Sequence, residues 1–149
     1  MSGSDIFSIV GSALGAQDAR LGAIASNLAN ADTVTRPGAQ PYRAHEIVFA
    51  AAPLAGAASG GSDAGSGSGL PDLGVTVAGT VQSNAPPVQT YDPGSQFANA
   101  QGYVTGSNVS QVGQMVDLID SSNSYAAAVA ILQQSTRIDQ QMLASFQVA

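Results

Sequence analysis

Apolar residues near the N-terminus recur about every 3.5 positions, a spacing that constrains how this segment can fold. A helix with this repeat carries one apolar stripe that fits along a second helix, whereas a lone surface helix does not require such regularity. The sequence therefore predicts a helix from near Ser4 to near Asn30 that packs against another helix. One stripe position is polar, Gln17, and the apolar ones are Phe7, Val10, Leu14, Leu21, Ile24 and Leu28.

A second segment with the same repeat predicts the partner helix, from about Val109 to Phe146. Additional apolar residues such as Met115 and Ile119 lie beside its stripe, so this helix carries two adjacent apolar faces and can contact two neighbours. The stripe includes Leu118, Tyr125, Val129, Leu132, Leu143 and Phe146.

Two interpretations of this helix pair remain open from pattern alone. In the first, the stripes are the inner faces of one monomeric hairpin. In the second, they also contact other protein chains. We favour the second, because two helices cannot cover each other's stripes on both flanks and the chain between them offers little apolar mass.

The chain between the helices, residues 35–108, differs in composition from both. It holds all seven prolines and most glycines, and short β-type runs predict strands at 46–49, 74–81, 88–91 and 102–104. In the second run, Gly79 replaces an apolar residue, which predicts a bulge or a close backbone approach. Residues 55–69 are almost entirely Gly, Ser and Ala, a composition that cannot pack a core and predicts a mobile loop.

The low charge of the chain excludes some classes of partner. Only 9% of the residues are charged, lysine is absent, and the formal net charge is -6. With so few cations, binding to nucleic acid or to an acidic membrane surface is not expected. A surface this poor in ions is one that other protein surfaces can cover at low desolvation cost.

No catalytic, metal or cofactor site is predicted. The single histidine, His45, precedes a predicted strand, and we expect it to have a structural role. The chain has no cysteine, and its carboxylates are scattered except for Asp117 and Asp120, which favour a solvated helix face over a metal site. A serine hydrolase is the enzymatic alternative, but the GSGSG of residues 65–69 matches the nucleophile motif only through low complexity.

The N-terminal segment does not predict a cleaved leader or a membrane span. Asp5, Ser8 and Ser12 interrupt its apolar residues, and no apolar run approaches the roughly 18–20 residues that cross a bilayer. We therefore expect no direct insertion into a membrane, and any export by a route that leaves no cleaved signal peptide.

Several short motifs follow one another along nearly the whole chain. They are SNLANADT at residues 26–33, PGAQPYR at 37–43, YDPG at 91–94, GYV at 102–104 with NV at 108–109, and MVDLI with SYAAAV between 115 and 129. In this order they resemble the motifs of bacterial flagellar axial proteins, the group that forms the rod and hook. The short middle region is similar to that of proximal-rod subunits, and the alternative within the group is a different rod or hook-junction component.

The resemblance implies a mainly α fold with a small β region. The N- and C-terminal helices would pair as a coiled-coil-like hairpin, and a middle β or extended segment would project outward. Residues 1–34 and 109–149 would form the helical core in the inner tube of the rod, and residues 35–108 an outer layer. Asn27 and Asn30 would satisfy backbone groups where the first helix ends and fix its register against a neighbour.

The resemblance also implies a structural role in the rod of the basal body, which spans the periplasm. The subunit would polymerise through its terminal helices into the shaft that transmits torque and encloses the export channel. Its partners would be copies of itself, other proximal and distal rod subunits, and the adaptor to the export gate and MS ring. Export would use the flagellar type III apparatus.

Overall fold

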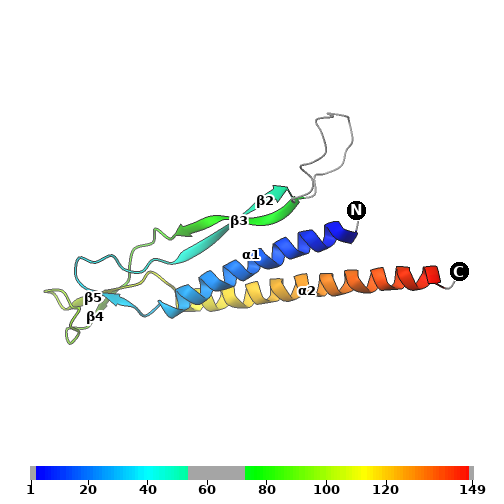
Figure 1. Ribbon diagram of the computed structural model, residues 1–149. Helices are drawn as coiled ribbons and strands as arrows, with labels where there is room; N and C mark the ends of the chain where they lie inside the picture. Colours follow the sequence, from blue (N-terminus) through cyan, green and yellow to red (C-terminus); the bar gives the residue numbers. More distant parts are fainter. Residues whose placement is uncertain (1–2, 54–72, 148–149) are drawn as a thin grey trace, which may run out of the picture.

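Two long helices dominate the structure, a computed structural model that describes residues 3–53 and 73–147. Helix α1 spans Gly3–Ala29 and α2 spans Gln111–Gln147. They lie side by side and run in opposite directions, and α2 extends beyond the N-terminal end of α1 (Figure 1). Both helices occur where the sequence predicted them.

Helix α1 ends where polar side chains form hydrogen bonds with the backbone carbonyls of its last turn and of the residue that follows it. The side-chain amide of Asn30 donates to the carbonyl of Ser26 at 2.8 Å, and the Thr33 hydroxyl donates to the carbonyl of Asn30 at 2.7 Å. These local bonds compete with further helical bonds. Shortly after, Gly38 adopts φ +85°, a left-handed conformation in which the chain turns back.

In the described part of the chain, five strands form two small sheets. The longer pair consists of β2, His45–Pro53, and β3, Leu73–Gln82, which are antiparallel. The second sheet has the order β1-β5-β4, formed by Val34–Thr35, Tyr103–Gly106 and Gln89–Tyr91. The four predicted runs all contribute strands, and β1 was not predicted. The predicted mobile loop at 55–69 lies outside the described residues.

The β2–β3 pair contains the irregularity expected near Gly79. Val48 pairs with Gly79, whereas Phe49 pairs with Val77, so Ala78 is the extra residue on β3. Such a bulge increases the local twist of a two-stranded ribbon. The twisted ribbon lies along α1, and the Val75 amide donates to the Ser12 hydroxyl of that helix at 3.1 Å.

Helix α1 lies between α2 and the β2–β3 ribbon, and its most buried apolar side chains form the centre of the fold (Figure 1). These are Val10, Ala16 and Ile24. Two of them belong to the predicted stripe, and Ala16 lies beside it. A small residue at position 16 lets a neighbouring backbone approach α1 closely.

The buried face of α2 differs from the predicted one. Its least exposed residues are small or polar and recur every seven positions: Ser121 is 0% exposed, Ala128 is half-buried and Ser135 is 8% exposed. Of the predicted apolar stripe, Val129 and Leu132 are half-buried, whereas Leu118, Tyr125 and Leu143 are exposed, so the stripe does not form the centre of the contact with α1. An α-helix that is apolar on several sides has no unique inner face from its pattern, and the fit of small side chains against α1 selects this one.

Candidate assembly surface

Asn27 is the buried polar residue that joins α1 to the rest of the molecule. Its side chain is 1% exposed and makes four hydrogen bonds. Its amide donates to the His45 carbonyl at 2.8 Å and to the Gln114 side-chain oxygen at 2.9 Å. Its oxygen accepts from the His45 backbone N–H at 2.8 Å and from the Tyr42 hydroxyl at 3.1 Å. Asn27 therefore fixes the position of β2 and of α2 relative to α1.

Asn27 and Asn30 make different kinds of hydrogen bond in the structure. Asn30 bonds to the backbone at the end of its own helix, as expected. Asn27 instead bonds to β2 and α2 within the same subunit, so it sets the register of elements inside one chain. Register against a neighbouring chain stays a prediction.

His45 takes part in the same network through its ring. Its Nδ1 atom lies 3.0 Å from the Tyr42 hydroxyl, and its Nε2 atom lies 3.4 Å from the Gln82 amide nitrogen. The two rings of Tyr42 and His45 pack edge to face with centroids 5.3 Å apart. Among the described residues, no group of three or more His, Cys, Asp or Glu side chains could hold a metal ion.

A second asparagine, Asn108, ties the segment before α2 to the β2–β3 ribbon. Its oxygen accepts from the Ala44 backbone N–H at 2.7 Å, and its amide donates to the carbonyls of Ser83 and Ala85. The sequence analysis does not predict a role for Asn108 in the site. The signal was present in the sequence, because Asn108 belongs to one of the motifs that carry the family resemblance.

The predicted interface residues fall into three groups by exposure. Buried are Val10, Ile24 and Asn27; half-buried are Leu14, Leu21, Leu28, Asn30, Val129 and Leu132; exposed are Phe7, Leu118, Tyr125 and Leu143. Phe146 lies in α2, but its side chain is outside the described part of the chain. One subunit thus covers the middle of the α1 stripe and leaves much of the α2 stripe open.

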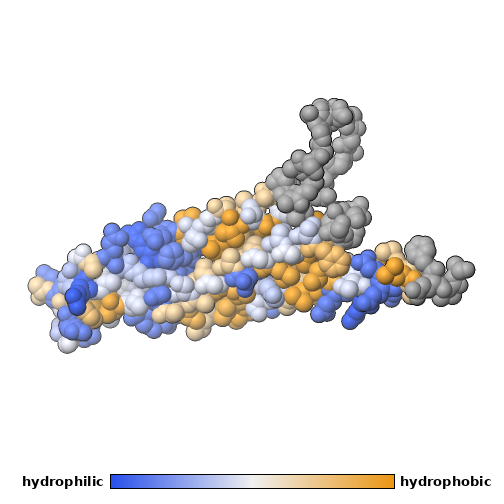
Figure 2. Space-filling view, in the orientation of Figure 1, coloured by the Kyte–Doolittle hydropathy of each residue, from blue (hydrophilic) through white to orange (hydrophobic). Residues whose placement is uncertain are grey.

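Helix α2 carries further large apolar side chains that are exposed. They are Val112, Met115, Val116, Ile119, Ile131, Ile138 and Met142. Figure 2 shows apolar surface spread along the molecule rather than confined to a single spot. Apolar surface of this extent is typical of proteins that bind other proteins.

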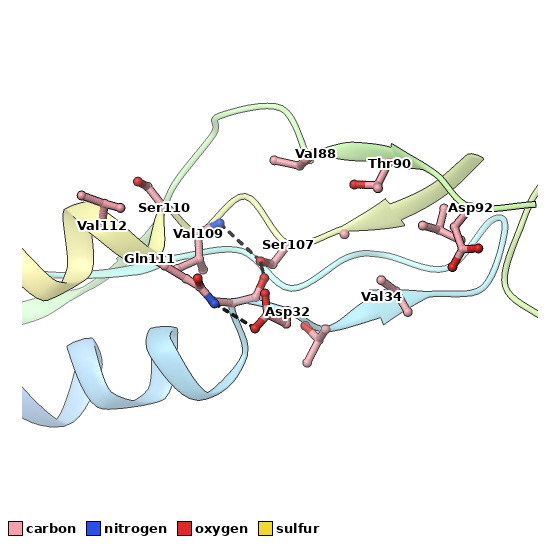
Figure 3. Close-up of a pocket in the computed structure, with 14 residues that line it drawn as sticks. Asp32, Val34, Val88, Thr90, Asp92, Ser107, Val109, Ser110, Gln111 and Val112 are labelled. Atoms are coloured by element: carbon pink, nitrogen blue, oxygen red, sulfur yellow. Dashed lines mark hydrogen bonds between the residues drawn. The ribbon is translucent and has the colours of Figure 1, made fainter. Parts of the chain in front are cut away.

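A groove lies where the end of α1 meets the start of α2 and the β1-β5-β4 sheet. Its volume is about 470 Å³, and its lining includes Val34, Val88, Val104 and Val112 together with Asp32. The Gln111 amide donates to the Asp32 carboxylate at 2.8 Å and so links the two helix ends across the groove (Figure 3). The groove presents valine side chains and carboxylates, and no nucleophile paired with a base.

No helix in the described part of the chain has the length and apolarity that a bilayer crossing requires. The apolar side chains of α2 are interspersed with asparagine, glutamine and aspartate.

The chain is similar to known proteins over most of its length. A family model described as "Flagella basal body rod protein" matches residues 8–37, and one described as "Flagellar basal body rod FlgEFG protein C-terminal" matches residues 100–145. The flagellar basal-body rod protein FlgC of Escherichia coli O157:H7 is 47% identical over 128 residues, which cover 86% of each chain. FlgC of Salmonella typhimurium LT2 is 45% identical over the same shares, and that of Yersinia enterocolitica 44% over 89% of each chain.

Proposed function

Because this chain belongs to the family of flagellar basal-body rod proteins FlgC, and is therefore a structural subunit of the proximal rod and not an enzyme, we propose that it assembles through the exposed apolar faces of its two helices. Its place is the basal body, together with other rod components.

The observation that carries this proposal is the distribution of side chains on α2. The most buried side chains of α2 are those of Ser121 and Ser135, and Leu132 is only half-buried, whereas most large apolar side chains of the helix are exposed. Burying a Leu, Ile or Met side chain gains roughly 1.5–3 kcal/mol, and the isolated subunit forgoes much of this gain. Contact with neighbouring subunits recovers it.

In the assembled rod, the helical core formed by residues 1–34 and 109–149 lines the inner tube. Residues 35–108 lie outside it as a β-rich layer. Two features support this arrangement: more than half of the large apolar side chains that are exposed lie on the helices, and Asn27 and Asn108 bond to the strands and the segments next to them. A rigid joint between the layers suits a shaft that transmits torque.

The tube formed by the helices encloses the export channel, and the subunit itself travels through that channel by the flagellar type III route. Its direct partners are copies of itself, other proximal and distal rod subunits, and the adaptor at the export gate and MS ring. The low charge of the chain supports close packing in such a tube, because few ions need to be desolvated.

The test places one carboxylate on the apolar surface of α2. Leu118→Asp is expected to leave the monomer folded, because Leu118 is exposed, and to block rod assembly, because burying an unpaired carboxylate costs several kcal/mol. The variant is expressed in cells that lack their own copy of the protein. Secreted subunit, isolated basal bodies and swimming are then measured.

The matched control is Asn123→Asp, which adds the same group at an exposed position that is already polar. It is expected to be exported, to build rods and to support swimming. If Leu118→Asp also builds complete rods, the apolar surface around position 118 is not an assembly interface.

A further inference from the structure

The hydrogen bonds of Asn27 fix the orientation of its side-chain amide. Its nitrogen donates to the His45 carbonyl at 2.8 Å, and its oxygen accepts from the His45 backbone N–H at 2.8 Å. A backbone carbonyl can only accept a hydrogen bond, and a backbone N–H can only donate one. Exchanging the oxygen and nitrogen of the Asn27 amide would therefore break both bonds.

The fixed Asn27 oxygen determines where the single proton of the Tyr42 hydroxyl lies. The hydroxyl lies 3.1 Å from Asn27 Oδ1 and 3.0 Å from His45 Nδ1. Because Oδ1 carries no proton, the contact with Asn27 is a hydrogen bond only if Tyr42 donates it. Donation to His45 instead would leave two oxygens 3.1 Å apart with no proton between them, beside a side chain that is 1% exposed. Such repulsion is strong where little water screens it, so the Tyr42 proton points to Asn27.

The His45 ring must then supply the proton for its own contact with Tyr42. Since the Tyr42 proton is used on Asn27, the 3.0 Å contact is a hydrogen bond only if Nδ1 of the ring donates. A neutral imidazole carries one ring proton, so Nε2 is bare when Nδ1 is protonated. The Gln82 amide nitrogen lies 3.4 Å from Nε2, as a long, weak donor to a bare nitrogen. The surroundings of both ring nitrogens thus favour the same tautomer.

We infer that His45 is a positioning residue: in its neutral form it carries its proton on Nδ1, and this proton directs the Tyr42 hydroxyl onto Asn27. The hydrogen bonds then run in one direction, from the His45 ring through Tyr42 to the Asn27 oxygen. The Asn27 amide donates onward to Gln114 on α2. Hydrogen bonds linked in this way polarise and strengthen one another. The ring proton therefore helps to hold the β2–β3 ribbon and both helices in their relative positions.

NMR spectroscopy of the full-length chain, without a histidine tag, reads the tautomer directly because His45 is the only histidine. The histidine is labelled with a nitrogen isotope, and spectra are recorded at alkaline pH, where imidazole is neutral. Nε2 is the nitrogen that couples strongly to both carbon-bound ring protons. We expect Nε2 to show the chemical shift of a bare nitrogen and Nδ1 that of a protonated one. Averaged shifts, or a proton on Nε2, overturn the inference.

A variant without the Tyr42 hydroxyl tests what selects the tautomer. Tyr42→Phe removes the acceptor of the Nδ1 proton, so the ratio of the Nε2–H to the Nδ1–H form is expected to rise about fivefold, the factor that one typical hydrogen bond supplies. Tyr103→Phe is the matched control, because its ring packs against Tyr91. It is expected to leave the His45 spectrum unchanged. An unchanged spectrum in Tyr42→Phe overturns the role of this hydroxyl.

Two amide substitutions at position 45 distinguish the ring nitrogens. An asparagine side chain can place its amide nitrogen where Nδ1 lies, whereas that of glutamine reaches the position of Nε2. In urea, His45→Gln is therefore expected to raise the ratio of unfolded to folded protein about fivefold more than His45→Asn does. Equal effects, or a milder effect of glutamine, overturn the role of Nδ1 as the donor.

The tautomer goes beyond the proposed function, which rests on the outer faces of the helices. The two fail separately. A chain that shows the Nδ1–H form but builds rods with Leu118→Asp contradicts the assembly surface alone. A chain that shows the Nε2–H form but builds no rods with Leu118→Asp contradicts the role of His45 alone.

Discussion

Asn27 shows how one buried amide can hold a fold that has little apolar core. Each of its four hydrogen bonds reaches a group outside α1, and two of them satisfy the backbone N–H and carbonyl of His45 at the start of β2. Buried backbone groups left without partners cost about 1–3 kcal/mol each. The hydrogen bonds of Asn27 thus constrain the positions of β2 and α2 relative to α1 more strongly than the half-buried leucines around them.

We predict that Asn27→Ala lowers the free energy of unfolding by about 3 kcal/mol, because the His45 backbone groups and the Tyr42 and Gln114 side chains lose their partner together. Urea unfolding followed by circular dichroism measures this change. Asn30→Ala is the control, since Asn30 bonds only to the Ser26 carbonyl through its amide, and it is expected to cost less than about 1 kcal/mol. Equal effects of the two variants would contradict the role assigned to Asn27.

At the scale of elements, α2 has an inner face that is not its most apolar one. Small side chains at 121, 128 and 135 allow α2 to lie close to α1. Two buried polar atoms in the described residues, the Ser121 hydroxyl and the Gln17 side-chain oxygen, have no hydrogen-bond partner. The pairing of the helices within one subunit is therefore weaker than their length suggests.

We predict that Ser121→Ala raises the free energy of unfolding by about 1 kcal/mol, because it removes a buried hydroxyl that has no partner. For a chain of this length, the expected rise in Tm is about 3 °C. Ser121→Leu is expected to lower the free energy of unfolding by about 2 kcal/mol, because Ser121 is fully buried and a larger side chain would force α1 and α2 apart.

Ser122, the exposed residue next to Ser121, provides the control for the two Ser121 variants. Ser122→Ala is expected to change stability by less than about 0.5 kcal/mol. Thermal unfolding of the three variants compares them. A destabilised Ser121→Ala would show that the hydroxyl has a stabilising partner in solution.

At the scale of the whole molecule, the fold is elongated and much of its order depends on neighbours. α1 is covered by α2 on one side and by the β2–β3 ribbon on another, whereas α2 has α1 as its main neighbour, and its residues 138–147 extend past the first described residue of α1 (Figure 1). A helix of about ten residues with no tertiary contact is marginal in water. Segments with few buried contacts open first.

We predict that the amides of residues 138–147 exchange rapidly in the isolated subunit and slowly in assembled rods. Those of residues 20–29, which lie between α2 and the ribbon, are expected to be protected in both states. Hydrogen exchange read by mass spectrometry on dilute subunit and on basal bodies compares the two. Equal protection of residues 138–147 in both states would show that this segment is ordered without a neighbouring subunit.

The sequence by itself determined the long elements and the identity of the chain. Both helices and four strands follow from local periodicity, which depends only on residues near in sequence. The family motifs are likewise short and contiguous. The pattern also indicated correctly that the two terminal segments lie side by side, because each carries a stripe that one helix cannot cover.

Only the tertiary structure decided which faces meet. Asn27 bonds to partners 18 and 87 positions away, and no local pattern relates such residues. Strand β1 has two residues, too few to show a period, and exists because β5 supplies its partner. The inner face of α2 was chosen by the close fit of Ser121, Ala128 and Ser135 against α1, since hydropathy alone cannot select among several apolar faces of one helix.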